Sequence, residues 1–149
     1  MSQHTGKIGL GSDHAGYLLK ELIKEKLVEK GFEVRDFGAF SEDSADYPDH
    51  IHPLCRVIES GELGRGIIMC GSGNGVSITA NKYAGIRAAL SWNPEIARLA
   101  RAHNDANVLA LPARFIDTKD ALQAVDAFLD TPFEGGRHTG RVKKIPTGQ

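Results

Sequence analysis

Cysteine, long apolar runs and net charge are all scarce in this chain of 149 residues, and each shortage argues against a class of protein. Two cysteines, Cys55 and Cys70, are too few for a disulfide framework, so each thiol must serve packing or chemistry. No apolar run approaches the roughly 20 residues that a membrane span needs, and the polar residues 1–7 do not begin a signal peptide. A net charge of −1 gives no bulk attraction for nucleic acid or anionic membranes. We therefore expect a cytoplasmic protein that binds neither.

Two common glycine motifs for nucleotides are also missing. The P-loop consensus does not occur in the sequence. A dinucleotide-binding fingerprint begins at Gly9 and Gly11, but His14 stands where its third glycine belongs, although Asp36 fits the position of the ribose-binding acid. A nicotinamide-dependent oxidoreductase is therefore a disfavoured alternative.

Short apolar runs alternate with segments of helical periodicity along the chain, without repeats or a domain-scale linker. We expect strands at residues 7–12, 32–37, 66–70, 86–91 and 108–111. We expect helices at residues 14–30, 48–60, 74–83, 94–103 and 118–128. This alternation predicts a single α/β domain over residues 1–149, with a five-stranded parallel sheet covered by helices on both faces.

Ligands of such sheets bind at the carboxyl ends of the strands, where the strand order reverses. Several polar residues are expected there because they follow the first, third, fourth and fifth strands: Asp13, His14, residues 70–75, His103, Asn104 and Arg114.

The most informative of these segments joins the third strand to the next helix: Cys70, Gly71, Ser72, Gly73, Asn74 and Gly75. Its three glycines allow backbone N–H groups to converge on one point, and a helix N-terminus adds positive potential. Such a nest binds a phosphate, a carboxylate or an enolate oxygen, and the same field stabilises a thiolate at Cys70. The alternative is that Cys70 is simply the last buried residue of its strand.

Three further residues have both a functional and an ordinary interpretation. Asp13 fits a helix cap, but a cap does not explain the imidazole of His14 at the end of a strand. His103 fits a favourable charge at a helix C-terminus as well as an acid–base group.

Basic residues near the C-terminus could hold a phosphate. Arg137 and Arg141 are four residues apart, so they share one face if this stretch is helical. A solvated basic tail is the alternative, because residues 131–149 carry no strong core pattern. Arg114, just past the fifth strand, is a third candidate.

A zinc site is not expected at His50 and His52. These residues lie two apart on an expected helix, so they point to different sides and lack a third ligand at suitable spacing. Cys55, on the apolar face of that helix, is expected to pack in the core.

Six segments in this order together resemble the ribose-5-phosphate isomerase B family, within the wider group that includes galactose-6-phosphate isomerase subunits. They are residues 11–16 (GSDHAG), 46–48 (DYP), 70–75 (CGSGNG), 80–82 (ANK), 103–109 (HNDANVL) and 134–138 (EGGRH). The resemblance covers nearly the whole chain and implies a three-layer, Rossmann-like α/β/α sandwich.

The resemblance also implies a reaction, the interconversion of ribose 5-phosphate and ribulose 5-phosphate without a metal or an organic cofactor. Cys70 would be the base that moves a proton between C2 and C1. Some members instead use a glutamate just after the glycine loop, where this chain has Val76, so it belongs to the cysteine type. A free thiol titrates near pH 8.5, so the loop must assist its deprotonation.

Further roles come from the same resemblance. His103 would open the furanose ring with help from Asp13 and Tyr47, while Ser72 and the backbone of residues 71–75 would hold the enediolate. Asn104 would contact the sugar. The phosphate would be bound by residues that match His14, Arg114, Arg137 and Arg141.

Family members are homodimers or dimers of dimers with shared active sites, so we expect residues 131–149 to form an arm that contacts a partner subunit. Two alternatives stay open. One is the same chemistry on a six-carbon substrate, allose or galactose 6-phosphate. The other is a sugar-phosphate-binding module without turnover, which would need the arginines but not the thiol.

Overall fold

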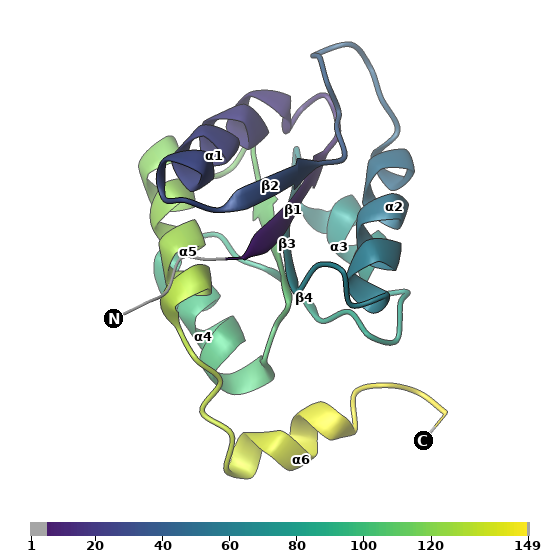
Figure 1. Ribbon diagram of the computed structural model, residues 1–149, viewed down its shortest axis with the longest axis vertical. Coiled ribbons are helices and arrows are strands. Elements are labelled where there is room, and N and C mark those ends of the chain that lie inside the picture. Colours follow the sequence, from purple (N-terminus) through teal and green to yellow (C-terminus); the bar gives the residue numbers. More distant parts are fainter. Residues whose placement is uncertain (1–5, 149) are drawn as a thin grey trace.

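The computed structural model describes residues 6–148 and contains one parallel sheet with five strands. The strands are β1 (Lys7–Ser12), β2 (Glu33–Asp36), β3 (Arg65–Cys70), β4 (Ala88–Leu90) and β5 (Val108–Pro112). Their order across the sheet is β2-β1-β3-β5-β4 (Figure 1). The predicted five-stranded parallel sheet is therefore confirmed, with β2 at one edge and β3 at its centre.

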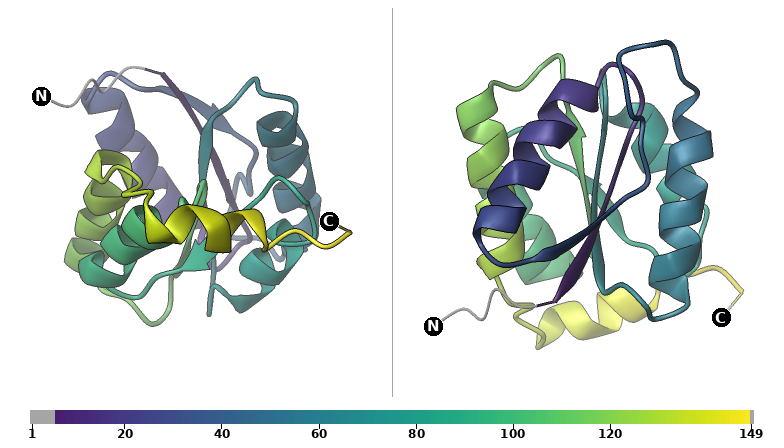
Figure 2. Two further views of the ribbon diagram at one scale, coloured as in Figure 1. Left: turned by 90° about the horizontal axis from the view of Figure 1, so that it is seen from below. Right: turned by 45° about the horizontal axis from the view of Figure 1, so that its top comes forward.

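Helices cover both faces of this sheet. They are α1 (Tyr17–Glu29), α2 (Tyr47–Glu59), α3 (Asn74–Ala80), α4 (Pro94–Asn104), α5 (Thr118–Asp130) and α6 (Arg137–Lys143). The first face packs against α1, α4 and α5, and the second against α2 and α3 (Figures 1 and 2). Alternate residues of β3 supply the two cores, since Ile67 and Met69 belong to the first and Ile68 and Cys70 to the second. The three-layer α/β/α sandwich is thus confirmed. No helix within residues 6–148 is both long and apolar enough to cross a bilayer.

Several boundaries differ from the sequence prediction, and at two of them a side chain captures a backbone group. α1 begins at Tyr17 rather than residue 14, since the Asp13 carboxylate accepts the N–H of Gly16 (3.0 Å) and holds a turn there. β4 covers only Ala88–Leu90, because the N–H of Arg87 donates to the side-chain oxygen of Asn107 (2.8 Å). α3 ends at Ala80, three residues earlier than predicted.

The C-terminal tail forms a helix that the core pattern did not predict. α6 lies across the end of the sheet where the strands begin (Figures 1 and 2). The segment before it is fixed to α4, because the N–H of Glu134 donates to the carbonyl of Ala102 (3.0 Å). His138 is buried, which shows that α6 packs against the body of the protein.

The order in which successive strands are added to the sheet reverses between β1 and β3. From β1 the chain moves outward to β2, whereas from β3 it moves to the other side. The three central strands end nearly level, since Ser12 pairs with Met69 and Cys70 with Pro112. The loops that follow β1, β3 and β5 therefore meet at one edge of the sheet, at the kind of position where α/β proteins bind ligands.

Candidate active site

Cys70 is the last residue of β3 and lies at this carboxyl edge. It is 5% exposed, and it is followed by a loop whose Gly73 has a φ of 78°, a left-handed conformation that glycine adopts readily. A Cβ at Gly73 would collide with Leu90, so the sharp turn into α3 also depends on the absence of a side chain. Within the loop, Ser72 Oγ accepts the N–H of Asn74 (3.2 Å). The expected glycine turn is present beside the thiol.

The ring of Tyr47 lies directly against this loop. A Cβ at Gly75 would come within 2.5 Å of Tyr47 Cζ, so only a glycine permits this approach. Tyr47 is the first residue of α2, which packs on the same face of the sheet as Cys70. The helix thus brings the phenol expected to assist catalysis to the glycine loop.

Arg114 contacts the loop from the other side. Its N–H donates to the carbonyl of Gly71 (2.9 Å), which fixes the turn after β5 to the turn after β3. Its side chain also passes close by, with Arg114 Nη1 3.5 Å from the position of a Cβ on Gly71. A guanidinium at this place can neutralise an anion bound at the loop.

Asp13 and His14 complete the carboxyl edge. Gly16, whose N–H is held by the buried Asp13, packs so closely on β3 that a Cβ there would come within 2.7 Å of Met69 Cγ. His14 Nδ1 lies 3.1 Å from the backbone nitrogen and 3.3 Å from the carbonyl oxygen of Ala45, which fixes the ring to the loop before α2. The structure therefore brings Asp13, His14, Tyr47, the loop of residues 70–75 and Arg114 together.

His103 and Asn104 lie at the amino edge of the sheet, where the strands begin. The prediction that they lie at the carboxyl edge, beside Cys70, is therefore wrong. They are the last residues of α4, which starts at the carboxyl edge and runs back across the sheet. Its 11 residues span about 16 Å, close to the length of a six-residue strand. β5 begins at Val108 soon after, so His103 and Asn104 lie where strands begin.

The amino edge gathers the remaining candidates. Arg137 and Arg141 are both on α6, in the helical conformation on which their shared face depends. The rings of His103 and His138 stack with centroids 4.3 Å apart. Desolvation of the His138 ring and the positive charges of His103 and Arg137 lower the pKa of His138.

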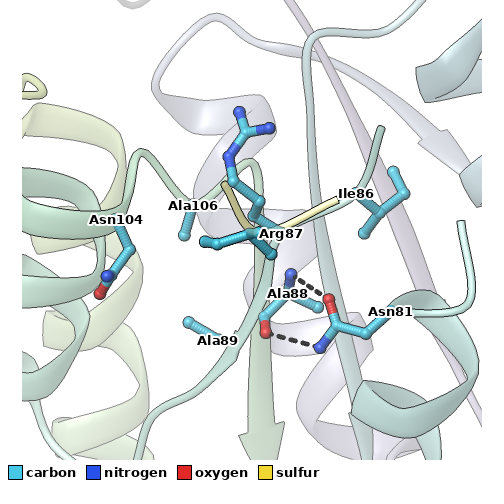
Figure 3. Close-up of a pocket in the computed structure, with 8 residues that line it drawn as sticks. Asn81, Ile86, Arg87, Ala88, Ala89, Asn104 and Ala106 are labelled. Atoms are coloured by element: carbon cyan, nitrogen blue, oxygen red, sulfur yellow. Dashed lines mark hydrogen bonds between the residues drawn. The ribbon is translucent and has the colours of Figure 1, made fainter. Parts of the chain in front are cut away.

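A cavity of about 270 Å³ opens at this amino edge (Figure 3). Its lining residues are Asn81, Ile86, Arg87, Ala88, Ala89, Asn104, Ala106 and Ile145. Asn81 fixes one wall by donating to the carbonyl of Ala88 (3.0 Å) and accepting its N–H (2.9 Å). The cavity includes Asn104 but not the loop of residues 70–75, so it is separate from the carboxyl-edge site of the same chain.

The side chains that a dinucleotide site or a zinc site would use are hydrogen-bonded to other groups of the protein. Asp36 accepts hydrogen bonds from Lys20, Lys24 and the N–H of Gly38, so its carboxylate is engaged rather than placed for a ribose. His50 is hydrogen-bonded to the carbonyl of Phe37, and His52 to the hydroxyl of Tyr83. Cys55 is fully buried on the inner face of α2, and the prediction that it packs in the core is confirmed.

Sequence reasoning gave little weight to three residues at the amino edge. In the sequence His138 stands out only as the last residue of the segment 134–138, although it is buried and stacked on His103. Glu134 and Arg87 were not candidates, yet Glu134 lies beside both histidines and Arg87 lines the cavity. The one available signal was the position of Glu134 and His138 at the two ends of a segment that resembles the family.

The sequence model of the ribose/galactose isomerase family matches residues 8–145. The chain belongs to this family. Ribose-5-phosphate isomerase B of Escherichia coli is 46% identical to it over 139 residues, which cover 93% of each protein.

Solved structures of the family agree with the fold. A ribose 5-phosphate isomerase from Thermotoga maritima superimposes with a TM-score of 0.92 at 52% identity, covering 95% of this chain and 97% of that one. Ribose-5-phosphate isomerase B from Mycoplasma genitalium, whose structure contains bound ribulose 5-phosphate, gives a TM-score of 0.88 at 42% identity and covers 93% of both chains.

Proposed function

We propose that this protein is an aldose–ketose isomerase that interconverts ribose 5-phosphate and ribulose 5-phosphate. The observation that carries the proposal is the placement of the Cys70 thiol beside the glycine loop, with Asp13, Tyr47 and Arg114 around it. A relative with 42% identity holds ribulose 5-phosphate, which supports the same substrate here. Family membership alone would not settle the activity, since one fold hosts many reactions.

The proposed chemistry is a proton transfer between adjacent carbons. The Cys70 thiolate takes the proton from C2 of the open-chain aldose, and the electron pair moves into a C1–C2 double bond, giving an enediolate. The proton on the Cys70 thiol is delivered to C1 while the proton of the C2 hydroxyl passes to O1, which gives the ketose and restores the thiolate, and no electrons leave the substrate. Backbone N–H groups of residues 71–75 and the hydroxyl of Ser72 would stabilise the negative oxygen of the intermediate.

A second copy of the chain would complete this site. His103, Asn104, Arg137 and Arg141 lie at the amino edge, separated from Cys70 of their own chain by the length of the strands. In a two-fold dimer each contact occurs twice, so the amino edge of one copy can lie on the carboxyl edge of the other. We assign residues 131–149 as the arm that makes this contact in a homodimer or a dimer of dimers.

The roles divide between the two edges of such a shared site. His103 of the second copy would transfer the proton that opens the furanose ring, assisted by Asp13 and Tyr47, and Asn104 would contact the sugar. The phosphate would be bound by hydrogen-bond donors of both copies. His14 and Arg114 would come from the copy that supplies Cys70, and Arg137 and Arg141 from the other copy. These arginines can make bidentate hydrogen bonds to phosphate oxygens.

Six-carbon phosphates are the second candidate substrates, because the matched family includes galactose as well as ribose isomerases. The purified protein should convert ribose 5-phosphate to a ketose in buffer containing a chelator and no nicotinamide. Parallel assays with allose 6-phosphate and galactose 6-phosphate test the alternative. Lack of turnover with all three would overturn the isomerase assignment, and turnover with a hexose phosphate alone would correct the substrate.

The two free thiols suit a reducing compartment, so we place the enzyme in the cytoplasm.

A further inference from the structure

Three side chains at the amino edge form a cluster of potential metal ligands. Glu134 Oε1 lies 3.6 Å from His138 Nε2 and 3.9 Å from His103 Nε2. One ligand atom from each residue lies within 4.8 Å of the other two. Among residues 6–148, these are the histidine, cysteine or carboxylate side chains that come close enough together to hold one metal ion. The cluster joins the end of α4 to the start of α6.

The buried member of the cluster has an unsatisfied nitrogen. His138 is 7% exposed, and its Nε2 is inaccessible to solvent and makes no hydrogen bond. The nearest carboxylate oxygen, at 3.6 Å, is too far for one. A buried polar atom without a partner is costly, so its presence indicates a ligand that the polypeptide itself does not supply.

We propose that His103, Glu134 and His138 form a binding site for a divalent transition-metal ion such as Zn²⁺. Two imidazoles and one carboxylate are a ligand set that zinc accepts, with a fourth position left for water. Tetrahedral bonds of about 2.0–2.1 Å place ligand atoms roughly 3.4 Å apart. The two distances to Glu134, 3.6 and 3.9 Å, are close to this value, and the two histidine nitrogens lie within 4.8 Å of each other. The stacked rings must tilt for both lone pairs to point at the ion.

The charges around the cluster limit its affinity for a cation. Arg137 and Arg141 nearby repel a cation, and only Glu134 contributes negative charge among the three ligands. In the isolated chain the side chain of His103 is 37% exposed and that of Glu134 is 55% exposed. The proposed function assigns His103 to the shared substrate site, so an ion would enter through that site.

Metal binding would inhibit the isomerase, a consequence that rests on the function proposed above. An ion at this site occupies the lone pair of His103 Nε2, which is then unable to accept or deliver the proton that opens the sugar ring. The site is therefore distinct from a catalytic metal centre, because loading it removes an acid–base group instead of supplying one.

Binding is tested directly on the purified full chain by titration with Co²⁺, followed by visible absorption, and by competition with Zn²⁺. We expect one ion per chain, with nitrogen and oxygen ligation and no thiolate charge-transfer band. Glu134→Gln and His138→Ala should each weaken binding at least tenfold. His52→Ala is the matched control, since its imidazole is bonded to Tyr83 elsewhere, and should leave binding unchanged. Glu134→Gln changes an exposed side chain, so it remains informative if His138→Ala does not fold.

Inhibition is tested separately with ribose 5-phosphate as substrate. Zn²⁺ should inhibit the unmodified enzyme, and each variant should need at least tenfold more Zn²⁺ to lose half of its own uninhibited rate. Equal binding to the unmodified protein and to both ligand variants would overturn the proposal, as would a thiolate band that disappears in Cys70→Ser. Specific metal binding by a protein without isomerase activity would instead contradict the proposed function and leave the metal site intact.

Discussion

The two cysteines differ because of their surroundings. Cys55 is fully buried on the inner face of α2, where burial and the negative charge of Glu59 raise the pKa of its thiol to about 12. It is therefore a packing residue. Cys70 lies at the end of β3, where the peptide groups of the glycine loop and the side chain of Arg114 offer stabilisation for a negative charge.

Replacing Cys70 by alanine should remove the proton-transferring group without closing the phosphate site. We expect kcat to fall by a factor of about 10³ or more, since a positioned base contributes 10²–10⁴-fold and its loss stops the carbon-proton step. The affinity for ribose 5-phosphate, measured by calorimetry, should change only a few-fold. Cys55→Ala is the matched control and should keep its turnover. Substantial activity in Cys70→Ala would assign the base to another residue.

His103→Asn should separate ring opening from proton transfer. Ribose 5-phosphate exists mainly as a furanose, whereas ribulose 5-phosphate is open-chain because its C5 hydroxyl is esterified. We expect turnover of ribose 5-phosphate to fall about 100-fold or more. Exchange of the C1 proton of ribulose 5-phosphate in D₂O, followed by NMR, should fall much less. An exchange rate as low as that of Cys70→Ala would contradict this division of roles.

At the scale of elements, α6 presents positive charge at the end of the sheet. Arg137→Ala should raise KM for ribose 5-phosphate about 10- to 100-fold, because a bidentate guanidinium–phosphate contact is lost. The turnover at saturation should change far less, since no proton passes through this residue. Steady-state kinetics measure both. Arg98→Ala is the control, because Arg98 is exposed and paired with Glu95. An unchanged KM in Arg137→Ala would exclude α6 from the site.

The interaction between Lys20 and Asp36 joins α1 to β2. Lys20 is fully buried, and its Nζ lies 2.8 Å from Asp36 Oδ2. Burial alone would raise the pKa of Asp36, but the hydrogen bonds from Lys20, the N–H of Gly38 and Lys24 outweigh it and lower that pKa. Because the folded pKa is below the unfolded one, this carboxylate stabilises the protein above about pH 4, and the contribution is lost as the pH falls through the folded pKa.

Lys20→Met should therefore cost about 3 kcal/mol in the free energy of unfolding at pH 7, since it leaves a buried carboxylate with weaker partners. Urea unfolding at several pH values measures this cost. The difference between the two proteins should begin to shrink as Asp36 becomes protonated in the variant, and should shrink further as the pH falls towards the lowered pKa of Asp36 in the unmodified protein. A cost that stays constant down to pH 3 would show that lost packing, rather than the ion pair, accounts for it.

At the scale of the whole molecule, the sequence was most informative where function and fold depend on local pattern. Apolar runs and glycines predict the sheet, and the glycine pattern after the third strand predicts the loop at Cys70. The same pattern does not predict the position of His103, because a helix that follows a short edge strand carries its last residues back across the sheet. α6 was missed for a related reason. Its buried residue is a histidine, His138, which gives no apolar periodicity.

The central claim is that one active site is built from two chains, and mixing two inactive variants tests it most directly. Cys70→Ala and His103→Ala should each be inactive towards ribose 5-phosphate as homodimers. Co-expressed in equal amounts, they should form mixed dimers with one intact site, restoring about a quarter of the unmodified activity if chains pair at random in a two-fold dimer. If each chain instead supplied both residues to its own site, the mixture would stay inactive, and that result would contradict the account.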